Sequence, residues 1–302
     1  MSRMRIGWGL PVSGSWATPE NVVTIAGRAD ELGYATLWSF QRLLVPVGSP
    51  LGPQYRSVAD PLLPLAFAAA VTRRARLGAA VVNMPFQAPP VLAKQFATLD
   101  ALSAGRAVAG LGLGWVPEEF EGVGVPYERR GARGEEYVAA LRALWGPDPV
   151  AFDGEFYRVP ESSVLPKPAR PGGPPVLLGG GAPRALDRVG RLADGWISSS
   201  RADPETMRLP ITAVKDAARA AGRDPEALEF VMRGVVRTGP RTGPLTGTLD
   251  EIAADLPAVA AQGVTELFVD LNFDPSIGNP EADPAASMSR ALETLEALAP
   301  GA

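Results

Sequence analysis

The sequence alternates short apolar runs with segments of helical spacing, and this alternation repeats eight times. In the first repeat, an apolar run from Met4 to Leu10 precedes Thr18-Pro19-Glu20, which supplies an N-cap, a proline at the first helical position and an early acid. Gly33 then ends the helical segment. Eight strand–helix repeats predict a (β/α)8 TIM barrel of the α/β class, because doubly wound sheets usually have fewer strands.

The same cues give the element boundaries. The expected strands are 4–10, 35–39, 76–82, 107–113, 175–178, 195–199, 228–236 and 265–271. The expected helices include 89–102, 129–145, 248–262 and 286–298, and others begin at Asp60-Pro61, Ala182 and Asp203-Pro204. Active sites of TIM barrels lie at the C-terminal ends of the strands. These ends therefore select the candidate functional residues.

One segment, about 146–174, interrupts the alternation. It contains β-prone residues on both sides of Asp153-Gly154, a pair typical of a hairpin turn, and then a proline-rich stretch that ends at Pro175. The alternation resumes directly afterwards, so we interpret the segment as an insertion with a small hairpin. The sequence thus predicts one barrel domain over 1–302, with long loops over 40–58 and 116–128 at the C-terminal face.

Residue usage excludes several classes of site. The chain has no histidine and no cysteine, which excludes a Ser-His-Asp triad, a histidine-ligated metal centre and an iron–sulfur cluster. Carboxylates alone can bind magnesium, but no motif indicates a metal. The net charge of −4 disfavours nucleic acid as a partner. The sequence has no apolar run of membrane-spanning length and no signal-peptide pattern, so we expect a soluble, cytoplasmic protein.

The strongest local signal is a glycine-rich turn between the fifth strand and its helix. Its residues are Gly179, Gly180, Gly181, Ala182 and Pro183. Glycines let backbone N–H groups approach an anion, and the N-terminus of the following helix attracts negative charge, so the turn is a candidate phosphate cradle. The alternative is a tight turn without a ligand. Hydroxyl groups after the sixth strand, including that of Ser199, lie near this turn in any barrel.

A second glycine-rich stretch, Gly110-Leu111-Gly112-Leu113-Gly114-Trp115, ends the fourth strand. It fits the dinucleotide fingerprint poorly, because Trp115 takes the last position and we expect Pro117 to prevent an immediate helix. We interpret it as a backbone ledge against which a flat ring can lie. Glu118 and Glu119 follow, as acid–base candidates or, more commonly for loop carboxylates, as solvated side chains.

The second and third strands end in further polar residues. Gln41 is suited to hydrogen bonding with the edge of a heterocycle and Arg42 to binding an anion, although both also suit a loop surface. Asn83 either caps backbone groups or contacts a ligand. Asp270 and Asn272 end the last strand, where turn chemistry is the ordinary role. None of the lysines stands at a strand end, which disfavours Schiff-base chemistry.

Other motifs occur in a fixed order along nearly the whole chain: Arg5-Ile6-Gly7, Ala29-Asp30-Glu31-Leu32-Gly33-Tyr34, Ala97-Thr98-Leu99-Asp100-Ala101-Leu102-Ser103-Ala104-Gly105-Arg106, Gly112-Leu113-Gly114-Trp115, Asp153-Gly154-Glu155-Phe156-Tyr157 and Arg191-Leu192-Ala193-Asp194-Gly195-Trp196. Their order and spacing resemble those of the bacterial luciferase-like flavin oxidoreductases, the luciferase-like monooxygenase superfamily. The stretches 39–46 and 127–131 are most similar to the actinobacterial branch that uses the deazaflavin coenzyme F420.

This resemblance implies a deazaflavin or FMN in the barrel mouth and, commonly, a homodimer. The phosphate would lie on the loop from Gly179 to Pro183, and the ring over the third and fourth strands. The cofactor residues carried over by position are Ser39, Val82, Asn83, Gly112, Gly114, Gly179, Gly180, Gly181, Ala182, Pro183 and Ser199. The family often has a non-prolyl cis peptide bond at the end of the third strand, which would fall near Val82-Asn83 here.

One departure from the family concerns the proton donor. Many members have Ser-Asp-His after the second strand, where this chain has Phe40-Gln41-Arg42. The remaining candidates are Gln41, Arg42, Glu118, Glu119 and Tyr55.

Three functions are consistent with these features. The first is an F420-dependent oxidoreductase that transfers a hydride between the deazaflavin C5 carbon and a small organic substrate. The second is an FMN-dependent luciferase-like monooxygenase, and the third is a non-catalytic deazaflavin-binding protein.

Overall fold

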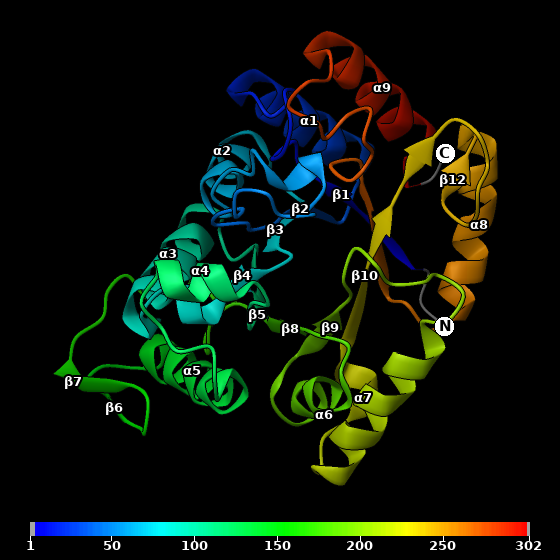
Figure 1. Ribbon diagram of the computed structural model, residues 1–302. Coiled ribbons are helices and arrows are strands. Elements are labelled where there is room, and N and C mark those ends of the chain that lie inside the picture. Colours follow the sequence, from blue (N-terminus) through cyan, green and yellow to red (C-terminus); the bar gives the residue numbers. More distant parts are fainter. Residues whose placement is uncertain (1–3, 301–302) are drawn as a thin grey trace.

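A computed structural model describes residues 4–300 as a closed parallel barrel surrounded by helices (Figure 1). The strands pair in the order β3-β2-β1-β13-β10-β9-β8-β5-β4, and a further pairing of β3 with β5 closes the ring. The barrel strands are β1 (Arg5–Gly9), β2 (Thr36–Ser39), β3 (Arg76–Ala79), β4 (Val82–Asn83), β5 (Ala107–Gly112), β8 (Val176–Gly179), β9 (Gly195–Ile197), β10 (Glu229–Val235) and β13 (Glu266–Asp270). The predicted TIM barrel is confirmed, with its third strand divided into β3 and β4.

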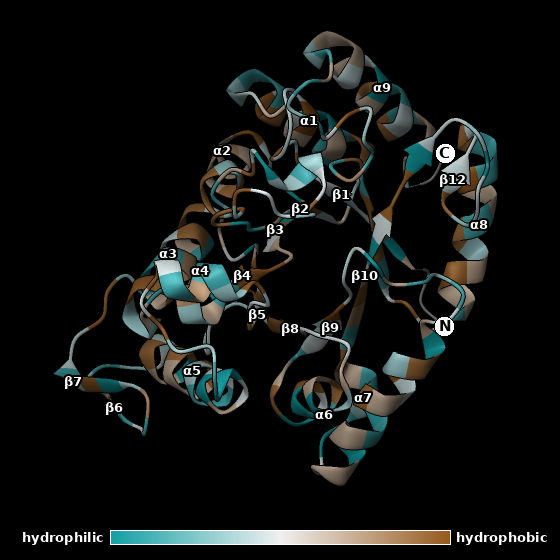
Figure 2. Cartoon of the chain, viewed as in Figure 1, coloured by the Kyte–Doolittle hydropathy of each residue, from teal (hydrophilic) through white to brown (hydrophobic). Residues whose placement is uncertain are grey.

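The helices lie outside the ring of strands (Figure 1). They are α1 (Pro19–Leu32), α2 (Leu63–Val71), α3 (Pro89–Leu102), α4 (Pro117–Gly122), α5 (Arg130–Trp145), α6 (Pro183–Leu192), α7 (Arg208–Ala220), α8 (Leu249–Ala261) and α9 (Pro284–Ala297). Figure 2 shows apolar residues on the strands and on the faces that the helices turn towards them. Within residues 4–300, no helix has the length and hydropathy needed to cross a membrane.

The local signals in the sequence explain most helix ends. The Thr18 side chain accepts a hydrogen bond from the Asn21 amide at 3.2 Å, and Gly33 ends α1 with a φ of 87°. Thr248 and Glu251 form a capping box at the start of α8.

Three predicted helix features are wrong. Helix α2 begins at Leu63 rather than at Asp60, and α7 begins at Arg208 rather than at Asp203. In both places the aspartate accepts a hydrogen bond from the amide two residues later, at 2.8 Å from Leu62 and at 2.9 Å from Glu205. These aspartates therefore form local turns that precede the helices. Pro117 does not prevent a helix, because it occupies the first turn of α4, where a proline lacks no needed donor.

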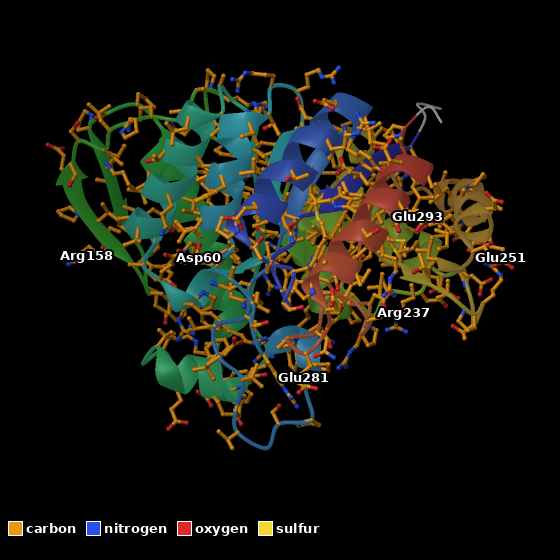
Figure 3. All side chains as sticks on the ribbon, turned by 90° about the horizontal axis from the view of Figure 1, so that it is seen from above. Asp60, Arg158, Arg237, Glu251, Glu281 and Glu293 are labelled. Carbon is orange, nitrogen blue, oxygen red and sulfur yellow. The ribbon has the colours of Figure 1, made fainter. Side chains whose placement is uncertain are left out.

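The insertion forms the expected hairpin of β6 (Val150–Asp153) and β7 (Arg158–Ser162), outside the barrel (Figure 1). Its turn is attached to α5, because the Glu136 carboxylate accepts hydrogen bonds from the amides of Glu155, Phe156 and Tyr157 at 2.7–2.9 Å. A second short pair, β11 (Arg237–Thr238) with β12 (Thr246–Gly247), follows β10 and was not predicted. Figure 3 shows Arg158 of the hairpin and Glu251 of α8 at opposite sides of the molecule.

The middle of the barrel is filled with apolar side chains. Trp38 and Phe268 stack with ring centroids 5.3 Å apart. The residues of this internal plug are Trp38, Ala80, Val108, Leu177, Ile197, Val231 and Phe268, and all are buried. The plug separates the two ends of the barrel interior, so the polar groups at one end do not contact those at the other.

The N-terminal end of the barrel is occupied by an ion network. The fully buried Glu266 carboxylate accepts hydrogen bonds from Arg76 at 2.9 Å, Arg5 at 3.2 Å and the Trp38 indole at 2.9 Å. Glu229 pairs with the same two arginines. Burial raises the pKa of Glu229, but the hydrogen bonds and charges of Arg76 and Arg5 outweigh burial and lower it below its usual value. The network therefore stabilises the charged carboxylate of Glu229.

Candidate active site

Two neighbouring strands, β5 and β8, end in a glycine that lacks a side chain. A Cβ added to Gly112 of β5 would lie 2.5 Å from Cγ2 of Val81, and one added to Gly179 of β8 would lie 3.4 Å from Cγ1 of the same residue. In β4, Val82 pairs with Leu111 and Asn83 pairs with Gly112. The structure thus brings Val82, Asn83 and Gly112 together around Val81. They form a surface of backbone and one aliphatic side chain that suits a flat ring, which we call the ring surface.

Gly114 lies just beyond this surface. Its φ is 77°, and an added Cβ would stand 3.0 Å from the Phe120 ring of α4 and 3.1 Å from the Phe86 ring. Since this backbone conformation favours glycine, Gly114 sets the path of the chain into α4.

The glycine turn after β8 has free hydrogen-bond donors. Between residues 4 and 300, no acceptor is found for the amides of Gly180, Gly181 or Ala182, and no side chain caps the N-terminus of α6. A cavity of about 400 Å³ adjoins the turn, with Gly180, Gly181, Trp196, Ser199, Thr206 and Met207 among its lining residues. The Trp196 indole donates to the Gly180 carbonyl at 2.8 Å and fixes the turn. Exposed amides at a helix N-terminus suit a phosphate.

The residues from Gly179 to Pro183 form this turn, and Ser199 lines the same cavity. The Ser199 hydroxyl accepts a hydrogen bond from the Arg201 amide at 3.3 Å. Arg184 and Arg201 are exposed, and no ion pair of either is found in the part of the chain that the structure describes. Both are available to attract an anionic ligand.

Ser39 is the last residue of β2 and Gln41 follows the strand, and their side chains have different partners. The Gln41 carbonyl oxygen accepts a hydrogen bond from the Asn83 amide at 2.7 Å, which joins the loop after β2 to the end of β4. The Ser39 hydroxyl instead donates to the Pro61 carbonyl at 2.5 Å, and the side chain is buried there. Gln41 is therefore close to Asn83 and the ring surface, whereas the Ser39 hydroxyl is engaged at the start of the α2 region.

The expectation that Glu119 is a solvated loop carboxylate is wrong. Glu119 lies on α4 with no exposed surface and pairs with Arg42 at 2.6 Å. Its other oxygen accepts a hydrogen bond from the Leu43 amide at 2.8 Å. The neighbouring Glu118 is exposed, as expected. Because α4 was not predicted, the burial of one carboxylate of the pair was not foreseen.

Arg42 connects Glu119 to an aromatic wall across the barrel mouth. Its guanidinium lies 4.8 Å from the Trp115 ring centroid and 5.1 Å from that of Tyr55. Tyr55 and Phe40 each pack against Phe273, with centroid distances of 5.5 and 5.3 Å. The wall thus joins the loops after β2, β5 and β13.

Arg233 was not predicted as a site residue. It lies on β10, is 7% exposed, and its Nε approaches Asp270 Oδ2 at 3.0 Å. Burial lowers the pKa of Arg233, and the charge of Asp270 partly offsets this effect. The available signal was one arginine near the C-terminal end of an otherwise apolar strand. Asp270 and Asn272 have the expected turn role, with Asn272 donating to Asp270 at 2.8 Å and to the Leu10 carbonyl at 2.9 Å.

The expected non-prolyl cis peptide bond is present, but it joins Ala80 to Val81 rather than Val82 to Asn83. It falls in the gap between β3 and β4, directly before the ring surface. Opposite it, a Cβ at Gly110 would lie 1.8 Å from the Ala79 carbonyl oxygen, so β5 requires a glycine at this close approach.

Across residues 4–300, no cluster of three potential metal ligands is found.

Residues 4–242 match the model of the luciferase-like monooxygenase family. The chain belongs to this family. Among curated proteins, it is 40% identical over 172 residues to an uncharacterized protein of Mycobacterium tuberculosis, a match that covers 57% of this chain and 60% of the relative's length. The solved structure of monooxygenase RslO1 from Streptomyces bottropensis has the same fold, with a TM-score of 0.79, 23% identity and 98% of each chain covered.

Two relatives whose names state a cofactor use different ones. The F420-dependent glucose-6-phosphate dehydrogenase of Nocardia farcinica is 36% identical over 175 residues, which cover 55% of this chain and 51% of the relative. The FMNH2-dependent dimethylsulfone monooxygenase of Pseudomonas putida is 31% identical over 156 residues, which cover 51% and 42%. These family members use F420 or reduced FMN, and the luciferase-like monooxygenases are an enzyme family.

Proposed function

We propose that this protein is an F420-dependent oxidoreductase, which transfers a hydride between deazaflavin C5 and a small organic substrate in the cytoplasm. The glycine turn supports a cofactor with a flat ring and a phosphate, because its free amides and the N-terminus of α6 provide a phosphate site beside the ring surface at Val81. The similarity to the Nocardia farcinica dehydrogenase supports F420. When bound, the deazaflavin supplies the hydride chemistry, and the protein supplies position and electrostatics.

The site residues then have separate roles. Gly180, Gly181 and Ala182 donate their amides to the phosphate, while Gly112, Gly179 and Val81 support the ring. Gln41 positions Asn83 at the edge of the ring surface through its 2.7 Å hydrogen bond. Arg42 and Glu119 hold the aromatic wall in place through their buried pair. An arginine stays protonated in proteins, so Arg42 orients the substrate by charge and hydrogen bonding and does not replace the family's histidine as an acid.

An FMN-dependent monooxygenase is the alternative, supported by the similarity to the Pseudomonas putida enzyme. The same cradle and ring surface accept either cofactor, since both have a flat tricyclic ring and a phosphate. A deazaflavin reacts poorly with oxygen, so the two functions predict opposite behaviour in air.

A binding titration distinguishes these functions. We expect F420 to quench the tryptophan fluorescence of the protein with a dissociation constant at least about ten-fold below that of FMN or reduced FMN, a difference of about 1.4 kcal/mol. Preference for reduced FMN together with oxygen consumption would instead establish the monooxygenase. Tight F420 binding without turnover of a broad panel of reducible compounds would favour a non-catalytic binding protein.

We also propose that the protein is a homodimer. Three exposed apolar side chains follow one another at four-residue spacing on α2, namely Leu63 (66% exposed), Phe67 (52%) and Val71 (39%). Val91 on the adjacent α3 is exposed as well. A stripe of this kind on one helix face is typical of a surface that another subunit covers.

Replacing Phe67 with glutamate is expected to convert the dimer into a monomer, because a carboxylate would be buried unpaired in the interface. Size-exclusion chromatography with light scattering measures the mass. The matched control is Leu165→Glu, which places the same charge on an exposed leucine of the insertion, far from α2 in sequence. A monomeric wild-type protein, or a Phe67→Glu protein that stays dimeric, would contradict this assignment.

A further inference from the structure

Arg233 is a buried cation whose donors are largely unused. Its side chain is 8% exposed, and its only close charged partner in the described chain is Asp270, at 3.0 Å from Nε. The approach does not have hydrogen-bond geometry, so Nε and Asp270 Oδ2 both remain buried without a partner. No hydrogen bond from Nη1 or Nη2 to any residue from 4 to 300 is found either.

Two partly buried arginines of this chain, Arg106 and Arg223, behave differently. Arg106 donates from Nε to the Ser103 carbonyl, and its two Nη atoms donate to four acceptors at 2.6–3.3 Å. Arg223 donates to the carbonyls of Gly190 and Ala193, each at 2.6 Å. These arginines have a structural role, and their donors are satisfied within the fold. Nε of Arg233 is the donor that is buried without a partner, whereas Nη1 and Nη2 are not fully enclosed and have no partner within residues 4–300. The two Nη atoms are therefore free to bind a ligand.

The surroundings of Arg233 hold the guanidinium in a fixed place. Its Cζ lies 4.8 Å from the centroid of the Phe40 ring, 4.9 Å from that of Phe273 and 5.4 Å from that of Phe268. Phe268 belongs to the internal plug, whereas Phe40 and Phe273 belong to the aromatic wall of the C-terminal mouth. The guanidinium therefore lies between the plug and the mouth, on the side of the barrel where the cofactor cradle lies.

Asp270 partly neutralises the charge of the Arg233 guanidinium but does not bind its Nη atoms. Its Oδ1 accepts hydrogen bonds from the backbone and side-chain amides of Asn272 at 3.0 and 2.8 Å, which disperse part of the carboxylate charge. Opposite Oδ1, Gly9 has no side chain, and a Cβ there would stand 2.9 Å away. The aspartate faces Nε, so the two Nη atoms form the free edge of the planar fork. A planar pair of N–H donors matches the two oxygens of a carboxylate.

We propose that Arg233 binds the carboxylate of an anionic substrate, so that the protein acts on small organic acids rather than on neutral compounds. The proposal rests on the proposed oxidoreductase function and specifies the substrate class of the same site. The carboxylate approaches in the plane of the guanidinium from its Nη edge, because the ring faces attract the cation and disfavour an anion. The ring surface at Val81 and the aromatic wall then receive the apolar part of the acid.

The test compares a flat carboxylate with its neutral counterpart. Benzoate and benzamide are titrated against the F420-loaded protein, with tryptophan fluorescence as the readout. We expect benzoate to bind at least about ten-fold more tightly than benzamide, since charge-assisted bidentate bonds are the strong ones. In the double variant Arg233→Met/Asp270→Asn, which removes both charges together, this preference should disappear. The matched control, Arg237→Met, removes an exposed arginine on β11 and should keep it (Figure 3).

Each outcome decides the proposal. Equal affinities in the wild-type protein, no binding of benzoate, or a preference that persists in the double variant would overturn it. If the double variant does not fold, Arg233→Lys replaces it, because lysine keeps the charge but lacks the fork, and the preference should then fall several-fold. If F420 does not bind, the proposed function fails, and the same titrations without F420 still decide whether Arg233 selects carboxylates.

Discussion

Replacing Gly181 with valine is expected to weaken cofactor binding about 100-fold while the barrel stays folded. A Cβ at Gly181 would meet no atom within 4 Å, and the residue does not have a positive φ, so the side chain itself is tolerated. It would, however, project beside the free amides of the glycine turn and prevent a phosphate from reaching them. Losing two charge-assisted hydrogen bonds, each at the lower end of the range of about 1.5–3 kcal/mol, removes about 3 kcal/mol, which corresponds to roughly 100-fold.

Fluorescence titration with F420 measures this effect, and thermal unfolding checks the fold. The matched control is Gly27→Val on α1, where an added Cβ also meets nothing within 4 Å. Unchanged affinity in the Gly181→Val protein would mean that the turn is a connection between β8 and α6 without a phosphate. Equal losses of affinity in the two variants would point to a general effect on the fold.

Replacing Glu266 with alanine should reduce the free energy of unfolding by about 3–5 kcal/mol, the usual cost of removing one partner of a buried ion pair. The carboxylate has no exposed surface and accepts hydrogen bonds from Arg5, Arg76, Thr36 and Trp38. Without it, buried donors at the N-terminal end of the barrel are left unpaired. Urea unfolding measures the change.

The control for Glu266 is Glu296→Ala. Glu296 pairs with Arg28 at 2.5 Å, but both side chains are more than 40% exposed. Surface pairs contribute at most about 1 kcal/mol, so this variant should unfold nearly like the wild type. If Glu266→Ala also costs less than about 1 kcal/mol, the buried network does not stabilise the barrel as we infer.

The barrel was predictable because each repeat has its own local signals. The apolar run, the cap at Thr18 and the glycine at Gly33 act within a few residues, and the helix 89–102 was predicted with the bounds that α3 has. The errors at Asp60 and Asp203 arise because an aspartate that accepts from the amide two residues later resembles an N-cap in sequence. Local patterns do not distinguish the two.

The site was only partly predictable, because much of it depends on contacts between distant segments. The glycine turn was recognisable from one continuous stretch. The pair of Arg42 with Glu119 spans 77 residues, and Gln41 reaches the Asn83 amide across 42 residues, so neither contact has a local signal. Arg233 was not predicted as a site residue, because it lies within an apolar pattern that indicates only a buried strand. Its role depends on Phe40, Phe273 and Asp270, which only the closed barrel brings to it.

The internal plug also constrains the order in which ligands bind and dissociate. Trp38, Val108, Leu177, Val231 and Phe268 block the barrel axis, and the ion network lies behind them. Reactants and products must therefore enter and leave through one opening, and a molecule bound over the ring surface obstructs exchange of whatever lies beneath it. Steady-state kinetics should show a compulsory order, in which the deeper ligand binds first and dissociates last, with dead-end inhibition when the outer ligand arrives early.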